Sequence, residues 1–122
     1  MNRLARHEAF QRWVAEKCRA AGAIVISTST TAPCDLVVQP KFHSPIFVEI
    51  KTKGRGQGRT GALKPLQRAL RDTIKAFPEY GAWFVTITRA YDGGINIIPY
   101  DSWLSTVLDA SIAELKEVTG AP

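Results

Sequence analysis

Phe47-Val48-Glu49-Ile50-Lys51 is an apolar run interrupted by two charged residues. Because side chains alternate along a β-strand, Glu49 and Lys51 should share one face, while Val48 and Ile50 occupy the other. The apolar residues at positions 46, 47, 48 and 50 indicate a strand that is buried on both faces. A buried carboxylate and ammonium need partners, such as a metal ion or each other. We therefore expect the charged face to line a functional cleft.

A second carboxylate, Asp35, opens another short apolar run at positions 36–38. The segment between the two runs, 39–45, contains two prolines and polar residues, which predicts the connection of an antiparallel hairpin. Pairing the runs would place Asp35 and Glu49 on neighbouring strands, roughly 5 Å apart. Two carboxylates so close repel each other unless a divalent cation lies between them.

Lys51 lies on the same strand face as Glu49. It would therefore lie beside a metal-bound water, or beside the phosphate group of a bound substrate. An acidic pair for Mg²⁺ or Mn²⁺, combined with a fixed ammonium, is typical of phosphodiester hydrolysis. The alternative interpretation is a solvated Glu–Lys pair on an edge strand, since a Glu-x-Lys spacing by itself is common.

Two segments resemble the motif of the PD-(D/E)XK nuclease superfamily: Pro33-Cys34-Asp35 and Glu49-Ile50-Lys51. Cys34, inserted between the proline and the aspartate, departs from that motif. The resemblance covers about residues 8–98 and implies a restriction endonuclease-like fold and a metal-dependent DNA endonuclease. It further implies that Asp35, Glu49 and the Ile50 carbonyl bind Mg²⁺ or Mn²⁺, and that Lys51 positions or activates the attacking water.

The first segment, 2–21, has apolar residues at helical spacing, with Gly22 at the expected C′ position. In the superfamily that the motif resembles, an acid of the first helix often completes the metal site. Glu8 is a carboxylate but points away from the apolar stripe, whereas Gln11 borders the stripe but is a poor Mg²⁺ ligand. We favour Glu8 because a cation requires an anion. A surface glutamate without a ligand role is the alternative.

Basic residues concentrate beside the proposed site. Positions 51–75 hold eight of the sixteen Lys and Arg residues and one acid, Asp72. The glycine-rich loop at 52–61 does not fit a Walker A pattern, but a basic loop next to a catalytic strand suits binding to a phosphate backbone. The residues expected to contact DNA are Lys53, Arg55, Arg59, Lys64 and Arg68. A solvated basic surface is the alternative.

Residues 62–77 predict a second helix, with Pro65 in its first turn and apolar residues at helical spacing. The pattern Leu63-x-Pro65-x-Gln67 resembles the "L-S-P-x-Q" element of the virus-type replication-repair nuclease (VRR-NUC) branch, while the size and the long first helix resemble archaeal-type Holliday junction resolvases. The resemblance implies that Gln67 assists catalysis by orienting water or Lys51. A helix-capping role for Gln67 is the alternative.

Two more strands are expected at 81–88 and 95–98, joined by a turn at 91–94, before a final helix that begins at Asp101-Ser102. The order helix, three strands, helix, two strands, helix predicts an α/β sandwich of the three-layer type, with a mixed central β-sheet flanked by helices. We expect one nuclease domain over residues 1–122. The apolar stripe of the last helix is assigned to the core, with a homodimer interface as the alternative.

Composition narrows the class of protein. The 45% hydrophobic content argues against disorder, and the net charge of +5 favours a polyanionic partner. No apolar stretch approaches the ~20 residues of a membrane span. Cys18 and Cys34 lack the spacing of a metal site, which predicts free thiols in a reducing, cytoplasmic setting.

The expected activity is cleavage of DNA selected by its shape. No segment predicts a separate helix for reading base edges in a groove, so branched, flapped or single-strand-bearing DNA is the expected substrate. Three alternatives remain open: a catalytically silent DNA-binding module of the same fold, a sequence-specific restriction-type nuclease, and a small structural protein with incidental charge.

Overall fold

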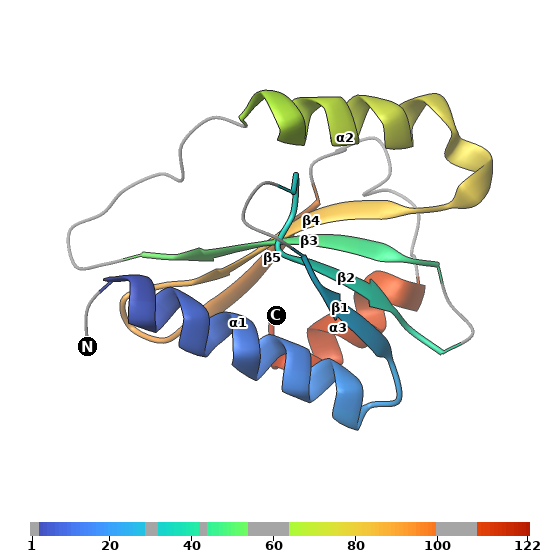
Figure 1. The fold of residues 1–122 in the computed structure, drawn as a ribbon. Coiled ribbons are helices and arrows are strands. Elements are labelled where there is room, and N and C mark those ends of the chain that lie inside the picture. Colours follow the sequence, from blue (N-terminus) through green and yellow to red (C-terminus); the bar gives the residue numbers. More distant parts are fainter. Residues whose placement is uncertain (1–2, 29–31, 42–43, 54–63, 100–109) are drawn as a thin grey trace.

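A five-stranded mixed β-sheet forms the middle layer of the molecule (Figure 1). The computed structural model describes residues 3–28, 32–41, 44–53, 64–99 and 110–122. The strands are β1 (Ile24–Ser27), β2 (Leu36–Gln39), β3 (Ile46–Thr52), β4 (Trp83–Arg89) and β5 (Ile95–Pro99). They lie side by side in sequence order, antiparallel except for the parallel pair β3–β4. The predicted mixed sheet is confirmed, with strand ends shifted by one or two residues.

Helices cover both faces of this sheet, as the sequence predicted. Helices α1 (Arg3–Ala20) and α3 (Ala110–Thr119) lie on one face, and α2 (Pro65–Ala76) lies on the other (Figure 1). Helix α2 connects β3 to β4, because parallel neighbours require a crossover rather than a tight turn. The result is a three-layer α/β sandwich.

The larger core lies between the sheet and α1 with α3. Phe10, Val14 and Cys18 repeat every four residues along α1 and are buried against the even-numbered side chains of β3, from Ile46 to Ile50. Each such side chain contributes about 1.5–3 kcal/mol when fully buried. Alternation along β3 then directs its odd-numbered residues to the opposite face.

Helix α1 ends where the sequence predicted. Gly22 has a φ of +94°, the left-handed conformation that glycine adopts without strain. The Ala23 N–H donates to the Cys18 carbonyl at 3.0 Å, and the Gly22 N–H donates to the Arg19 carbonyl at 2.9 Å. This C-terminal cap turns the chain back into the edge strand β1.

The layer under α2 is smaller and contains only part of the apolar stripe predicted for this helix, which was Leu66, Leu70, Ile74 and Phe77. Leu70 and Ile74 pack against Phe84 of the sheet, but Leu66 is 57% exposed. Gln67 occupies the buried position instead, with 6% exposure. The helix is thus rotated so that an amide, rather than a leucine, faces the sheet at its first turn.

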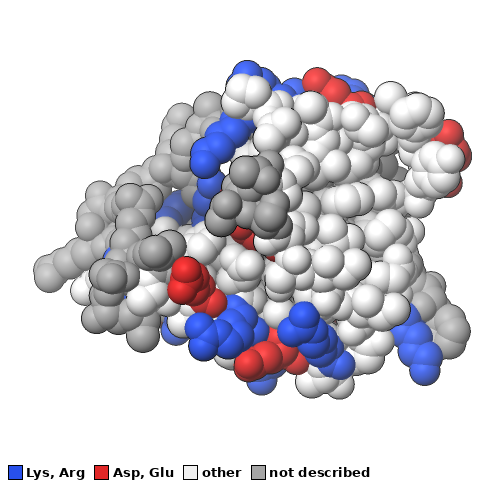
Figure 2. Space-filling view, in the orientation of Figure 1, with Lys and Arg blue, Asp and Glu red and all other residues white. Residues whose placement is uncertain are grey.

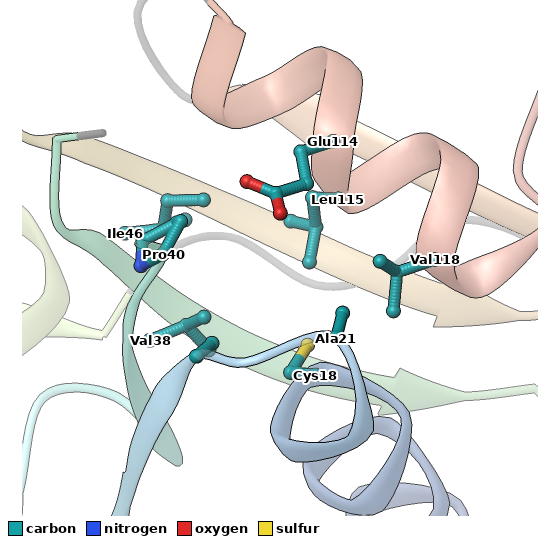
Figure 3. Close-up of a pocket in the computed structure, with 9 residues that line it drawn as sticks. Cys18, Ala21, Val38, Pro40, Ile46, Glu114, Leu115 and Val118 are labelled. Atoms are coloured by element: carbon teal, nitrogen blue, oxygen red, sulfur yellow. The ribbon is translucent and has the colours of Figure 1, made fainter. Parts of the chain in front are cut away.

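A small cavity of about 10 Å³ lies between α1, α3 and the sheet (Figure 3). It is lined mostly by apolar groups, together with Cys18 and the carboxylate of Glu114. Burial, with the negative charge of Glu114, raises the pKa of the Cys18 thiol to about 11. Since a cavity of this size holds about one water molecule at most, it is packing space rather than a ligand site.

Three further predictions concern the cysteines, the last helix and membrane-spanning segments. Cys18 and Cys34 are free and buried, as expected. The predicted start of the last helix at Asp101-Ser102 lies outside the described residues, while Ile112 and Leu115 of α3 are part of the core. Within the part of the chain that the structure describes, none of the helices has the length and apolar character needed to cross a membrane.

Candidate active site

The β2–β3 hairpin holds Asp35 beside β3. Leu36 lies opposite Val48, and Asp35 immediately precedes this pair. The Asp35 N–H donates to the Val48 carbonyl at 2.9 Å, and the Asp35 carbonyl accepts the Thr28 N–H at 3.0 Å. Hydrogen bonds on both sides therefore fix the backbone of Asp35 between β3 and the residue that follows β1.

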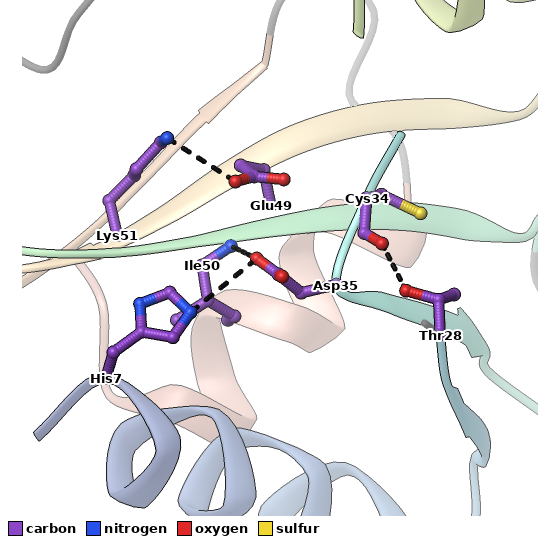
Figure 4. Close-up of polar contacts among 7 residues, drawn as sticks. All are labelled: His7, Thr28, Cys34, Asp35, Glu49, Ile50 and Lys51. Carbon is purple, nitrogen blue, oxygen red and sulfur yellow. Dashed lines mark hydrogen bonds and ion pairs between the residues drawn. The ribbon is translucent and has the colours of Figure 1, made fainter. Parts of the chain in front are cut away.

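The Asp35 carboxylate is fixed as well. Its Oδ2 accepts the Ile50 N–H at 2.8 Å and lies 4.0 Å from Nε2 of His7 (Figure 4). The hydroxyl of Thr28 donates to the Cys34 carbonyl, which secures the residue before Asp35. A carboxylate held by a backbone N–H is pre-oriented and loses little entropy when it binds a ligand.

Glu49 and Lys51 project from the same face of β3, as their spacing predicted. Nζ of Lys51 lies 3.4 Å from Oε1 of Glu49. The Glu49 side chain is 12% exposed and that of Lys51 is 29% exposed. The ammonium thus stands at the more open end of the pair, and the carboxylate stands deeper.

The surroundings of Glu49 disfavour its charge. Burial raises the pKa of Glu49, and the negative charge of Asp35 raises it further. The Lys51 ammonium, and hydrogen bonds from Lys51 and Gln67, act in the opposite direction. Two carboxylates that destabilise each other in this way are a place where a bound cation would lower the free energy.

Gln67 joins α2 to this site. Its Oε1 accepts the N–H of Lys64 at 3.0 Å, which caps the first turn of the helix. Because this oxygen is engaged as an acceptor, the amide NH₂ group is the donor in the hydrogen bond with Glu49. The helix-capping role is therefore confirmed, while the role of Gln67 in catalysis stays a prediction.

These residues meet in a surface hollow of about 480 Å³, which we call the acid hollow. Its lining residues come from α1, the hairpin and the start of α2: His7, Asp35, Glu49, Ile50, Lys51, Thr52 and Lys64. Figure 2 shows Lys and Arg side chains near the start of α2, and a mixture of basic and acidic side chains along α1.

The first-helix candidates lie elsewhere. Glu8 is exposed and shares a separate hollow with Gln11 and Arg12. His7, which the sequence reasoning missed, is the α1 residue that lines the acid hollow. The signal was present: His7 lies three residues before Phe10, so it continues the buried stripe, whereas Glu8 does not. The requirement for an anion led to Glu8, which the structure places outside the acid hollow.

The expected DNA-binding residues are distributed unequally. Lys64 is exposed and lines the acid hollow, while Lys53 lines an adjacent one. Arg68 is exposed on α2. Arg55 and Arg59 lie outside the described residues.

The donor groups suit a hard divalent cation. Asp35 and Glu49 offer carboxylate oxygens, and Ile50, whose side chain belongs to the core, lines the same hollow. In the described ranges, no three His, Cys, Asp or Glu side chains cluster closely enough to form a metal site. The two carboxylates by themselves fit Mg²⁺, which commonly binds one or two carboxylates and keeps several waters.

Gln67 provides a test of how the site is held together. Gln67→Leu keeps the size of the side chain but leaves the Lys64 N–H without its acceptor and Glu49 with Lys51 as its remaining side-chain donor, so stability should fall by about 1–3 kcal/mol. Urea unfolding would measure this change, with Gln11→Leu, a half-buried glutamine of α1, as the control. A Gln67→Leu protein as stable as the wild type would contradict the bridging role.

Comparison with solved structures finds a similar fold in an archaeal protein. Hjc, a Holliday junction resolvase of the hyperthermophile Archaeoglobus fulgidus, superposes with a TM-score of 0.53 and 18% sequence identity, over 72% of this chain and 74% of that chain. No family model and no curated protein sequence matches the chain. The comparison agrees with the resolvase-like resemblance at the level of the fold and does not extend to the VRR-NUC branch. The chain therefore has the three-layer α/β fold of an archaeal Holliday junction resolvase.

Proposed function

We propose that this protein is a metal-dependent DNA endonuclease that cuts branched or flapped DNA in repair, recombination or phage replication. The observation that carries the proposal is the meeting of Asp35, Glu49 and Lys51 in one hollow. The fold shared with a Holliday junction resolvase supports it, although a fold alone does not determine an activity.

In this proposal Asp35, Glu49 and the Ile50 carbonyl hold Mg²⁺ or Mn²⁺. The chemistry that such a cation supplies when bound is stabilisation of the negative charge that develops on the phosphate. Asp35 needs no large rearrangement, because its carboxylate is already fixed by the Ile50 N–H. His7 stands 4.0 Å from that carboxylate and limits its movement toward α1.

Lys51 is the residue that we assign to the attacking water or to the phosphate. Its ammonium is anchored by Glu49 yet remains partly exposed, so it can donate a second hydrogen bond into the hollow. Gln67 holds the other side of Glu49 from a buried position and thereby assists. Lys64, exposed at the edge of the hollow, is placed to contact a phosphate of the backbone.

We propose selection by DNA shape because the described helices are used to cover the sheet and are not available to contact base edges. All three described helices pack on the sheet, so none projects as a separate recognition helix. We therefore assign recognition to backbone contacts and to DNA that bends or opens at a branch. A homodimer would present two such sites to opposed strands, which suits a four-way junction.

The test compares a four-way junction, a flap and a linear duplex of shared sequence at one Mg²⁺ concentration and one salt concentration. We expect the branched DNAs to be cut faster than the duplex, with little sequence preference and with no cutting in EDTA. Sequence-specific cutting of the duplex at an equal or greater rate would indicate a restriction-type enzyme. Tight DNA binding without any cleavage would indicate the silent binding module.

A further inference from the structure

A second hollow, of about 420 Å³, adjoins the acid hollow at the ends of the parallel strands β3 and β4. We call it the side hollow. Its lining includes Arg6, Thr52, Lys53, Arg89, Tyr91 and Asp92. Thr52 lines both hollows, and Arg6 precedes His7 in α1, so the two spaces are neighbours. Of its lining residues, Lys53 is the one that the sequence assigns to DNA binding, and the others have no role in the proposed chemistry.

The side hollow is rich in positive charge. Arg6, Lys53 and Arg89 contribute three cations, against one carboxylate, Asp92. The Asp92 carboxylate is engaged within its own turn, where Oδ1 accepts the Gly94 N–H at 2.9 Å. If one phosphate of a DNA strand lies at Asp35 and Glu49, the positive electrostatic potential of the side hollow therefore favours binding of the next phosphate there.

Two of these cations belong to residues whose backbone is held by the sheet. The Lys53 N–H donates to the Arg89 carbonyl at 3.0 Å, which extends the parallel pairing beyond Thr52. The guanidinium of Arg89 lies 5.9 Å from the centre of the Phe10 ring. Because the backbone positions are fixed, little order has to be gained when a phosphate binds.

Tyr91 stands at this hollow on a rigid support. It occupies a tight turn in which the Gly93 N–H donates to the Ala90 carbonyl at 3.0 Å and the Ala90 N–H donates to the Gly94 carbonyl at 2.8 Å. Gly93 has a φ of +92°, which the turn requires and other residues rarely adopt. The Tyr91 side chain is nevertheless 61% exposed. A large aromatic ring is thus presented to solvent next to three cations.

We propose that the side hollow binds one unpaired nucleotide adjacent to the phosphate that is cut. Arg6, Lys53 and Arg89 contact its phosphate, and its base stacks on Tyr91. The base is unpaired because the faces of bases in a matched duplex are already stacked on each other, whereas an opened base offers its face to an aromatic side chain. The proposal rests on the proposed function and names the part of a branched DNA that the enzyme recognises.

Binding experiments in EDTA test this proposal without cleavage. The DNAs are a matched duplex and the same duplex with an unpaired flap, which carries 2-aminopurine at its first unpaired position. Tyr91→Ala should weaken flap binding about tenfold and remove the quenching of 2-aminopurine fluorescence by the protein, while Tyr91→Phe, which keeps the ring, should retain both. Lys53→Ala should make the negative slope of log K against log salt shallower by roughly 0.7 for single-stranded DNA.

Tyr80→Ala is the matched control, because Tyr80 is a tyrosine with 72% exposure that lies before β4 rather than after it. It should bind the flap like the wild type. Equal losses of binding to duplex and flap by Tyr91→Ala, or unchanged flap binding by Tyr91→Ala, would overturn the inference.

If the wild type cuts branched DNA while Tyr91→Ala binds it normally, the inference about the side hollow fails and the proposed function stands. If Tyr91 stacks on the base but no DNA is cut, the proposed function fails alone.

Discussion

Glu49→Gln should lower phosphodiester cleavage by roughly 10³-fold or more, because it removes one of the two carboxylates that the chemistry needs. The same change should make the fold more stable at neutral pH. Burial and Asp35 raise the pKa of Glu49, so the charged form is the less favourable one in the folded state. A neutral amide of the same size removes that unfavourable charge. Loss of function with gain of stability is the expected pairing at a binding site.

The sign of the pH dependence follows from the raised pKa. A carboxyl group whose folded pKa lies above its unfolded value of 4.5 contributes stability that is complete below that value and is lost as the pH rises through the folded pKa. The stability advantage of Glu49→Gln over the wild type should therefore be absent in acid and grow toward neutral pH. Urea unfolding at several pH values, without added metal, would measure it.

Mg²⁺ supplies the second half of this experiment. It should raise the unfolding midpoint of the wild type and leave that of Glu49→Gln nearly unchanged, since a ligand stabilises only the state that binds it. Glu117→Gln, at an exposed position of α3, is the control and should behave like the wild type in all assays. Full cleavage by Glu49→Gln, or equal stabilisation of both proteins by Mg²⁺, would remove Glu49 from the metal site.

Lys51→Met should lower cleavage by about 10²–10³-fold, because a positioned donor aimed at developing charge is lost. Methionine keeps most of the length and apolar surface of the lysine stem, so the packing of β3 is preserved. The change also removes the countercharge that lowers the pKa of Glu49, which should rise further. Protons then compete with the cation at higher pH, and the acid limb of the pH–rate profile should move toward alkaline pH.

Rates measured across pH, together with Mg²⁺ titration by calorimetry, would check both effects of Lys51→Met. Lys75→Met is the matched control, since Lys75 is exposed in the last turn of α2. An acid limb that stays where it is in the wild type would mean that Lys51 does not act on Glu49. Undiminished cleavage would show that the water and the phosphate are positioned by other groups.

The sequence predicted what depends on alternation and on local pairing. The two antiparallel hairpins and the shared face of Glu49 and Lys51 follow from patterns within about twenty residues, and the structure agrees with them. The three layers followed from the order of helices and strands. These features are fixed by backbone geometry, which the sequence pattern reports directly.

The sequence did not predict the rotation of α2 about its own axis, nor the contacts between residues that lie far apart in the chain. The rotation of α2 places Gln67 rather than Leu66 against the sheet, because the amide satisfies both the Lys64 N–H and the Glu49 carboxylate. A hydrophobicity pattern ranks these two residues in the opposite order. The side hollow joins Arg6, Lys53 and Tyr91, which are far apart in the chain, and no short motif connects them.

The placement of both carboxylates on one hairpin has a consequence for how the molecule can change. Asp35 and Glu49 are joined by a short loop, so their mutual geometry is a local property with a low loop-closure cost. The turn at 90–94 belongs to a different connection, between β4 and β5. Residues can be inserted or exchanged in that turn while the hairpin contacts stay as they are. Under the proposed function, a change in this turn alters which DNA is bound and leaves the pair of carboxylates as it is.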